Sequence, residues 1–379
     1  MLAPATPGEV AEVLADAAAE GRSVRPVGGG TKLGWGRPFP EPGLVVSTSG
    51  LAGVVEYNAA DLTVVVQAGV RLDELQAVLA GRGQMLPLDP PSADATVGGI
   101  VATADSGPLR HSAGGVRDLV LGITVALSDG TVARAGGKVI KNVAGYDLGK
   151  LYAGSFGTLG VIVEVALRLH PVPGERASAV GRSADPAALQ SAVSALMAAP
   201  LTLRALDVAW GEGAGSVLAE VAGAGAAGRL AAGAAVMESA GLAVEPAQEG
   251  GALWEAQRSG QRSGGPRGQG EGAVVRVSGL PAELGRVLAA LPAGASLVGR
   301  GGLGLSWVRL PAGSDEETAR AVSALRAALA PRPCVVLDAP PGVRELVDVW
   351  GPVDPVRAAL DRRVRERFDP AGIMNPGVL

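Results

Sequence analysis

The segment Val24-Arg25-Pro26-Val27-Gly28-Gly29-Gly30-Thr31 decides the fold, because a short strand runs directly into three consecutive glycines. Glycine has no Cβ, so the backbone N–H groups of such a turn can converge on an anion. The spacing fits neither common phosphate-binding motif. Leu33 stands where a dinucleotide-binding motif needs its third glycine, and no Gly-Lys-Ser/Thr closes a P-loop. Taken alone, the turn leaves two interpretations open: an anion-binding turn and a strained surface turn.

Further glycine clusters follow at Thr96–Gly99, Ser106–Pro108, Gly114–Gly115 and Gly154–Gly160. Several such loops within one domain indicate a single long ligand rather than unrelated turns. Strands and helices alternate between them. We expect helices over residues 7–19 and 72–80, and strands over residues 24–27, 44–48, 53–58, 63–68, 119–127 and 161–169.

The composition limits what kind of protein this is. A length of 379 residues predicts two domains, and a net charge of −4 with no basic domain argues against nucleic acid as a partner. One cysteine excludes an internal disulfide, and two histidines are too few for a zinc cluster, so we expect no metal and a cytoplasmic location. We also expect neither a signal peptide nor a membrane span.

The second half of the chain contains two rounds of strand, helix and strand, which is typical of a ferredoxin-like (split βαβ) domain. The segment 258–272 is almost wholly Arg, Ser, Gly and Gln, so we expect a mobile loop there. Asp354 and Pro355 begin a last helix that runs to Phe368 and precedes a turn-rich ending. The expected elements are strands 203–210, 216–221, 273–277, 303–310 and 334–337, and helices 228–239, 282–291 and 316–329.

Several motifs, taken in order, resemble one family. They are the glycine turn, Gly107-Pro108-Leu109-Arg110, Val116–Gly122, Lys141–Leu148, Gly154–Gly157 and the ending Asp369–Gly377. This order resembles the PCMH-type, or vanillyl-alcohol-oxidase-like, FAD-binding fold, and most closely the FAD-binding E subunits of bacterial glycolate oxidases. The resemblance implies an α+β protein: a PCMH-type FAD-binding domain of two α+β subdomains over 1–173, a smaller ferredoxin-like α+β cap domain over 174–350, and a C-terminal segment, 351–379, that packs on the FAD domain.

The resemblance also implies a function. The family oxidises glycolate, a 2-hydroxy acid, to glyoxylate in a complex with a second flavoprotein subunit and an iron–sulfur subunit. Such a complex would bring this chain to a membrane only peripherally, through its partners. Two alternatives stay open. One is a stand-alone FAD-dependent oxidoreductase acting on another hydroxy acid or alcohol, and the other is a scaffold subunit without flavin.

By this resemblance the glycine turn holds the FAD pyrophosphate and Gly157 and Ile162 lie beside the flavin ring. No His or Cys stands in the turn Gly30–Lys32, so we expect non-covalent FAD. The full set of expected cofactor-binding residues is Val27, Gly28, Gly29, Gly30, Thr31, Lys32, Pro91, Thr96, Gly98, Gly99, Thr103, Ser106, Gly107, Arg110, Gly114, Gly157, Val161, Ile162 and Asn375.

Candidates for the chemistry itself are few. A cation near flavin N1 would stabilise the anionic reduced flavin, and Lys141 is the first choice among the lysines. Arg110 suits a substrate carboxylate or a phosphate, and Tyr146 suits a hydrogen bond near the flavin. Each has a structural alternative: a solvated turn lysine, an arginine paired with a nearby Asp, and a packing tyrosine. The closely spaced pair of histidines that related dehydrogenases place around a metal is absent, because His111 and His170 lie far apart.

Overall fold

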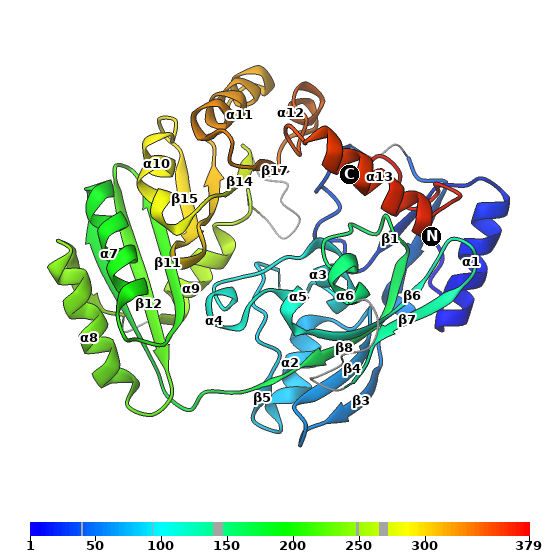
Figure 1. Ribbon diagram of the computed structural model, residues 1–379, viewed down its shortest axis with the longest axis horizontal. Coiled ribbons are helices and arrows are strands. Elements are labelled where there is room, and N and C mark those ends of the chain that lie inside the picture. The colour runs from blue at the N-terminus through cyan, green and yellow to red at the C-terminus, as the bar shows by residue number, and fades with distance from the viewer. Residues whose placement is uncertain (39–40, 93, 139–146, 248–249, 265–271) are drawn as a thin grey trace. The chain divides into compact units, whose positions relative to one another are not determined.

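The computed structural model describes residues 1–38, 41–92, 94–138, 147–247, 250–264 and 272–379 (Figure 1). The chain forms two compact units. The first contains 1–106, 113–172 and 352–379, and the second contains 107–112 and 173–351. The chain therefore changes unit one residue away from the expected boundaries near 173 and 351. The second unit, which we expected to be smaller, is nearly as large as the first, and the short segment Gly107–Ser112 belongs to it.

The first subdomain of unit 1 is built on a parallel strand pair. Helix α1 (Pro7–Ala19) begins at the expected cap, where Thr6 accepts a hydrogen bond from the N–H of Glu9. It buries Val10 and Leu14 with strands β1 (Val24–Val27) and β2 (Leu44–Ser47). The C-terminal segment joins this pair, because the Val24 N–H donates to the Ile373 carbonyl at 2.8 Å. The chain end thus returns to the strand that carries the glycine turn.

The second subdomain of unit 1 is an antiparallel sheet with the order β3-β4-β8-β6-β7. Its core contains apolar side chains of the sheet and of the helices that pack on it. The elements are β3 (Val54–Asn58), β4 (Thr63–Gln67), β6 (Val120–Ala126), β7 (Val132–Gly136), β8 (Val161–Arg168), α2 (Leu72–Ala80), α3 (Val97–Thr103), α5 (Val116–Leu119), α6 (Leu148–Tyr152), α13 (Pro355–Phe368), η1 (Thr48–Gly50), β5 (Gln84–Met85) and β9 (His170–Pro171). Two α+β subdomains were expected, and the structure confirms them.

Unit 2 contains the ferredoxin-like pattern twice. The first copy is β10 (Arg176–Ser183), α7 (Pro186–Ala198), β11 (Leu203–Gly211), β12 (Ala214–Ala222), α8 (Ala226–Ser239) and β13 (Ala243–Pro246). The second is β14 (Val274–Ser278), α10 (Leu284–Ala289), β15 (Ser296–Arg300), β16 (Leu305–Arg309), α11 (Asp315–Leu329) and β17 (Cys334–Asp338). The remaining elements of this unit are α4 (Arg110–Ala113, the last residue counted with unit 1), α9 (Gly250–Ser259), η2 (Pro281–Glu283), η3 (Gly301–Leu303) and α12 (Pro341–Leu346).

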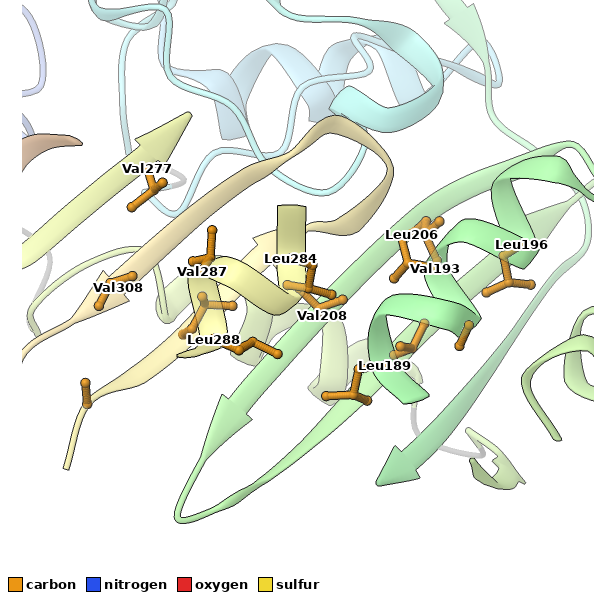
Figure 2. Close-up of a cluster of buried hydrophobic side chains, with 14 of the residues drawn as sticks. Leu189, Val193, Leu196, Leu206, Val208, Val277, Leu284, Val287, Leu288 and Val308 are labelled. Carbon is orange, nitrogen blue, oxygen red and sulfur yellow. The ribbon is translucent and has the colours of Figure 1, made fainter. Parts of the chain in front are cut away.

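The two copies share one eight-stranded sheet, because β11 pairs with β15 in antiparallel register. Figure 2 shows the helix-covered face, where α7 and α10 contribute to one apolar cluster with β11, β14 and β16. The seam also holds a buried ion pair: Arg300 of β15 lies 2.5 Å from Asp207 of β11, and both side chains are fully buried. The copies are therefore joined by apolar packing on one face and by this ion pair within the sheet.

The prediction of a mobile loop over 258–272 is wrong for the first residues of that segment. Residues up to Ser259 are in α9, and Gln261, Arg262 and Ser263 are buried. The Arg262 guanidinium donates to both carboxylate oxygens of Asp338, at 2.8 and 3.1 Å, and this bidentate pair fixes the turn. The composition of this arginine-rich segment did not reveal that one buried acid, Asp338, holds it in place. The rest of that segment, 265–271, lies outside the described residues.

No helix among the described residues combines the length and apolar character needed to cross a membrane.

Candidate functional site

The glycine turn lies against the loop that leads into α3. A Cβ added to Gly28 would lie 2.1 Å from Thr96 Oγ1, and one added to Gly29 would lie 2.5 Å from the Asp94 carbonyl oxygen. Gly30 has φ of +72°, a backbone conformation that side chains disfavour. Close approach explains the first two glycines and backbone conformation explains the third, so the turn is not a loosely held surface loop.

The start of α3 forms the second wall. The Thr96 side chain accepts a hydrogen bond from the Gly99 N–H at 3.3 Å and so caps the helix. Gly98, in α3, lies against Ala68, the residue that follows β4: its N–H donates to the Ala68 carbonyl at 2.8 Å, and a Cβ on Gly98 would lie 2.6 Å from the Ala68 side chain. The second glycine cluster therefore brings a short helix close to the strand beneath it.

One pocket of unit 1 lies where these walls meet. Its empty space is about 840 Å³, which includes the open solvent at its mouth. None of the described residues that line it is Asp or Glu. The lining residues are Arg25, Pro26, Val27, Gly28, Gly29, Gly30, Thr31, Lys32, Leu33, Trp35, Thr48, Thr96, Gly98, Gly99, Ala102, Thr103, Phe156, Gly157, Gly160, Val161, Ile162, Asn375 and Val378.

The C-terminal segment contributes a polar group to this pocket. Asn375 has φ of +44°, its N–H donates to the Val24 carbonyl, and its Nδ2 donates to the Phe156 carbonyl at 2.7 Å. Its Oδ1 is buried and finds no hydrogen-bond partner among the residues that the structure describes. A buried acceptor without a donor is costly, and a ligand N–H or O–H group would satisfy it.

Two cations line the pocket, and one is already neutralised. Lys32 Nζ lies 3.0 Å from Asp105 Oδ2, with both side chains nearly fully buried. Arg25 Nη2 donates to the Leu33 carbonyl at 2.9 Å, and partial burial lowers the pKa of Arg25 from its ordinary value. A guanidinium stays charged through a shift of this direction because its ordinary pKa is above 12.

Most of the expected cofactor-binding residues come together here. Those that line the pocket are Val27, Gly28, Gly29, Gly30, Thr31, Lys32, Thr96, Gly98, Gly99, Thr103, Gly157, Val161, Ile162 and Asn375. Pro91, Ser106, Gly107, Arg110 and Gly114 are not in its lining, and Gly107 and Arg110 belong to unit 2. Lys141 and Tyr146 lie outside the described residues.

Sequence reasoning missed several lining residues, among them Arg25, Trp35, Thr48 and Phe156. Arg25 could have been predicted to line the pocket, because it lies in the strand directly before the glycine turn. Phe156, with φ of +53°, lies within the Gly154–Gly157 motif, but only Gly157 of that motif was expected to line the cofactor. The two histidines are both outside the pocket. Burial lowers the pKa of His111, whose Nδ1 has no hydrogen-bond partner, and burial is also the main cause of the lowered pKa of His170.

These features fit the pyrophosphate and ring of a flavin dinucleotide. A Cβ added to Gly28, Gly29 or Gly98 would clash with a neighbouring residue, so these glycines let the turn and α3 pack closely around the pocket. No Asp or Glu is among the described lining residues, whereas Lys32 and Arg25 are. Asn375 Oδ1 offers an acceptor where the fold leaves one unsatisfied. The donor set suits a long, anionic, hydrogen-bonding ligand.

Comparison with known proteins decides which ligand this is. Residues 1–136 match the family model described as FAD binding domain. The chain is 41% identical over 148 residues to the glycolate oxidase subunit GlcE of Escherichia coli, covering 38% of this chain and 42% of that protein. It is 37% identical over 213 residues to the glycolate oxidase subunit GlcD of Bacillus subtilis, covering 55% of this chain and 45% of that protein. The chain is therefore a flavoprotein whose cofactor is FAD.

The flavoprotein is also similar to D-lactate dehydrogenase [cytochrome] of Arabidopsis thaliana, with 35% identity over 170 residues, 45% of this chain and 30% of that protein. The matched stretches amount to less than half of the length of these three curated relatives. In fold, it matches a solved structure of alkyldihydroxyacetonephosphate synthase with a TM-score of 0.73 and 16% identity, covering 99% of this chain and 75% of that one. This likeness extends the fold assignment beyond residues 1–136 to nearly the whole chain.

Proposed function

We propose that this flavoprotein is the FAD-binding subunit of a complex that oxidises a small 2-hydroxy acid, with glycolate as substrate and glyoxylate as product. The observation that carries the proposal is the glycine-lined pocket of unit 1, in a chain that is similar to glycolate oxidase subunits. D-lactate is the second candidate substrate, because the chain is also similar to relatives named D-lactate dehydrogenase.

Bound FAD would supply the hydride acceptor for oxidation of a 2-hydroxy acid. We assign the chain's own residues to holding the cofactor. The backbone N–H groups of Gly28–Thr31 would hold the pyrophosphate, Gly157, Val161 and Ile162 would hold the ring, and Asn375 Oδ1 would accept a hydrogen bond. Lys141, Arg110 and Tyr146 stay proposals for the chemistry.

We further propose that the chain works with a second flavoprotein subunit and an iron–sulfur subunit in the cytoplasm, since the named relatives include two different glycolate oxidase subunits. In that arrangement the partner flavoprotein holds the hydroxy acid site, and this chain contributes a second flavin. Non-covalent binding is expected, because no His or Cys stands in the turn Gly30–Lys32.

The test is a visible spectrum of the purified chain, followed by anaerobic addition of glycolate and, separately, D-lactate. The proposal predicts flavin bands that acid treatment releases and that persist when either acid is added to the chain alone. Bands that bleach with glycolate would mean that this chain has its own hydroxy acid site. Absence of bands after FAD is supplied would favour the scaffold alternative. Reconstitution with the two partner subunits should then restore bleaching by glycolate, and failure to do so would refute the proposed complex.

A further inference from the structure

The ion pair of Lys32 and Asp105 is buried in the wall of the FAD pocket. The side chains are only 5% and 3% exposed, and Nζ lies 3.0 Å from Oδ2. Nζ also donates to Thr31 Oγ1 at 3.1 Å, within the glycine turn itself. The other carboxylate oxygen, Oδ1, accepts the Ser106 N–H at 2.9 Å. Each partner is therefore tied both to the other and to its own backbone segment.

The pair connects the glycine turn to the far end of α3. The near end of that helix meets the turn through Thr96 and Gly28, where the backbone approach allows no Cβ. The far end leaves the helix at Ala104, whose φ is +51°, and the next residue is Asp105. The turn is thus held at both ends of α3: by backbone contact at one end and by the ion pair at the other.

The charges of Lys32 and Asp105 affect how strongly the pocket attracts a pyrophosphate. A buried ammonium next to a carboxylate contributes little net potential to the pocket, whereas a buried carboxylate alone would repel a pyrophosphate strongly in a medium of low dielectric constant. The indole of Trp35 lies 5.9 Å from Nζ and adds an apolar wall with a negative ring face. Arg25 is the other cation among the described lining residues, and its Nη2 donates to the Leu33 carbonyl.

We propose that Lys32 is a positioning residue: it neutralises Asp105 and fixes the glycine turn against α3, and it is not the group that binds the pyrophosphate. This rests on the FAD pocket of the proposed function and changes the role first expected for Lys32, from cofactor ligand to internal counter-ion of the wall. The backbone N–H groups of the turn are then the groups that meet the pyrophosphate, and the titrations below test whether Arg25 joins them.

The proposal predicts that the two charges are dispensable together but not singly. Lys32→Met leaves Asp105 as an uncompensated buried anion beside the pyrophosphate site, so FAD affinity should fall at least tenfold. Riboflavin, which has no phosphate, should lose less affinity than FAD. The double variant Lys32→Met with Asp105→Asn has no charge to compensate, and its FAD dissociation constant should return to within about threefold of the wild-type value.

The experiment is a set of titrations of the apoprotein with FAD and with riboflavin, followed by flavin fluorescence, for the wild type, both variants and Arg25→Gln. Arg25→Gln should weaken FAD binding and leave riboflavin binding nearly unchanged. If the double variant binds FAD as weakly as Lys32→Met, then Lys32 contacts the phosphate directly and the proposal is wrong. If Lys32→Met does not fold, the double variant decides alone: an FAD dissociation constant within about threefold of the wild-type value supports the proposal, and one at least tenfold higher overturns it.

Equal losses for FAD and riboflavin in a folded Lys32→Met would also overturn the charge argument, because they would indicate a purely structural effect. None of these measurements uses turnover. A failure of glycolate to reduce the flavin would therefore count against the proposed function and leave this inference unaffected.

Discussion

Substituting Gly28 by alanine tests the geometry of the cofactor turn directly. The new Cβ would lie 2.1 Å from Thr96 Oγ1, 3.2 Å from its Cβ and 3.4 Å from its Cγ2, so either the turn or the start of α3 must move by about an ångström. Gly28 has an ordinary φ, so backbone strain does not contribute and the effect comes from this contact alone. The methyl group also pushes on the hydroxyl that caps α3 at the Gly99 N–H.

Overpacking of this kind costs about 1–3 kcal/mol. If that cost falls on the geometry needed for the pyrophosphate, FAD affinity should drop by about 5- to 150-fold, at 1.4 kcal/mol for each factor of ten. Fluorescence titration of the apoprotein with FAD measures this change. Thermal unfolding of the apoprotein, followed by far-UV circular dichroism, gives the accompanying loss of stability.

Gly8→Ala is the matched control. Gly8 is in α1 of the same unit, has no positive φ, and its added Cβ would have no neighbour closer than 4.0 Å. It should bind FAD like the wild type and be slightly more stable, because alanine favours a helix. Gly28→Ala combined with Thr96→Ala should recover part of the lost affinity, since the clashing oxygen is gone. A Gly28→Ala protein with the FAD affinity of the control would refute the close approach of the turn to α3.

Three further predictions concern stability. Tyr152→Phe should leave stability unchanged or raise it by about 1–2 kcal/mol in urea unfolding, because the Tyr152 hydroxyl is buried with no hydrogen-bond partner and its ring still meets Phe368 edge-on; a clear loss would reveal a partner for the hydroxyl. Burial raises the pKa of Asp207 to about 7, against an ordinary 3.8. Between about pH 4 and 7 the native protein therefore keeps the carboxyl proton that the unfolded chain has lost. Because of this group, the free energy of unfolding falls as the pH rises through that window. Urea unfolding at pH 5 and pH 7 should therefore show a smaller loss towards pH 7 in Asp207→Asn than in the wild type, and equal losses would contradict the raised pKa. Arg262→Met should destabilise the protein by about 3–5 kcal/mol, because it leaves the buried Asp338 carboxylate without its bidentate partner. The same substitution should make the turn after α9 a site of rapid protease cleavage. An unchanged cleavage pattern would count against this anchoring role.

The parts of the fold that the sequence predicted are those with local signals. Helix α2 matches the expected residues 72–80, and α13 begins at the Asp354 cap, because apolar spacing and capping residues lie within the helix itself. Strand β10 and helix α7 were not among the expected elements. Their segments are rich in Ala, Ser and Gly, so their side chains carry little periodic signal. Pairing of β10 with β12 along eight residues fixes that strand, and this information comes from another part of the chain.

The residues of the site also divide into those that the sequence predicted and those that it did not. The glycines at 28–30 and 98–99 could be predicted from the sequence, because only glycine fits where a turn approaches its neighbour too closely for a Cβ. The charges around it could not be assigned, because Lys32 and Asp105 are far apart in sequence and nothing local in either segment identifies the other as its partner. A lysine beside a phosphate turn then suggests a ligand, whereas the same lysine next to a buried carboxylate is a counter-ion. Only the three-dimensional distance between the two groups separates these roles, and this is why the affinity of the doubly neutral variant, rather than that of either single variant, reports on which role Lys32 has.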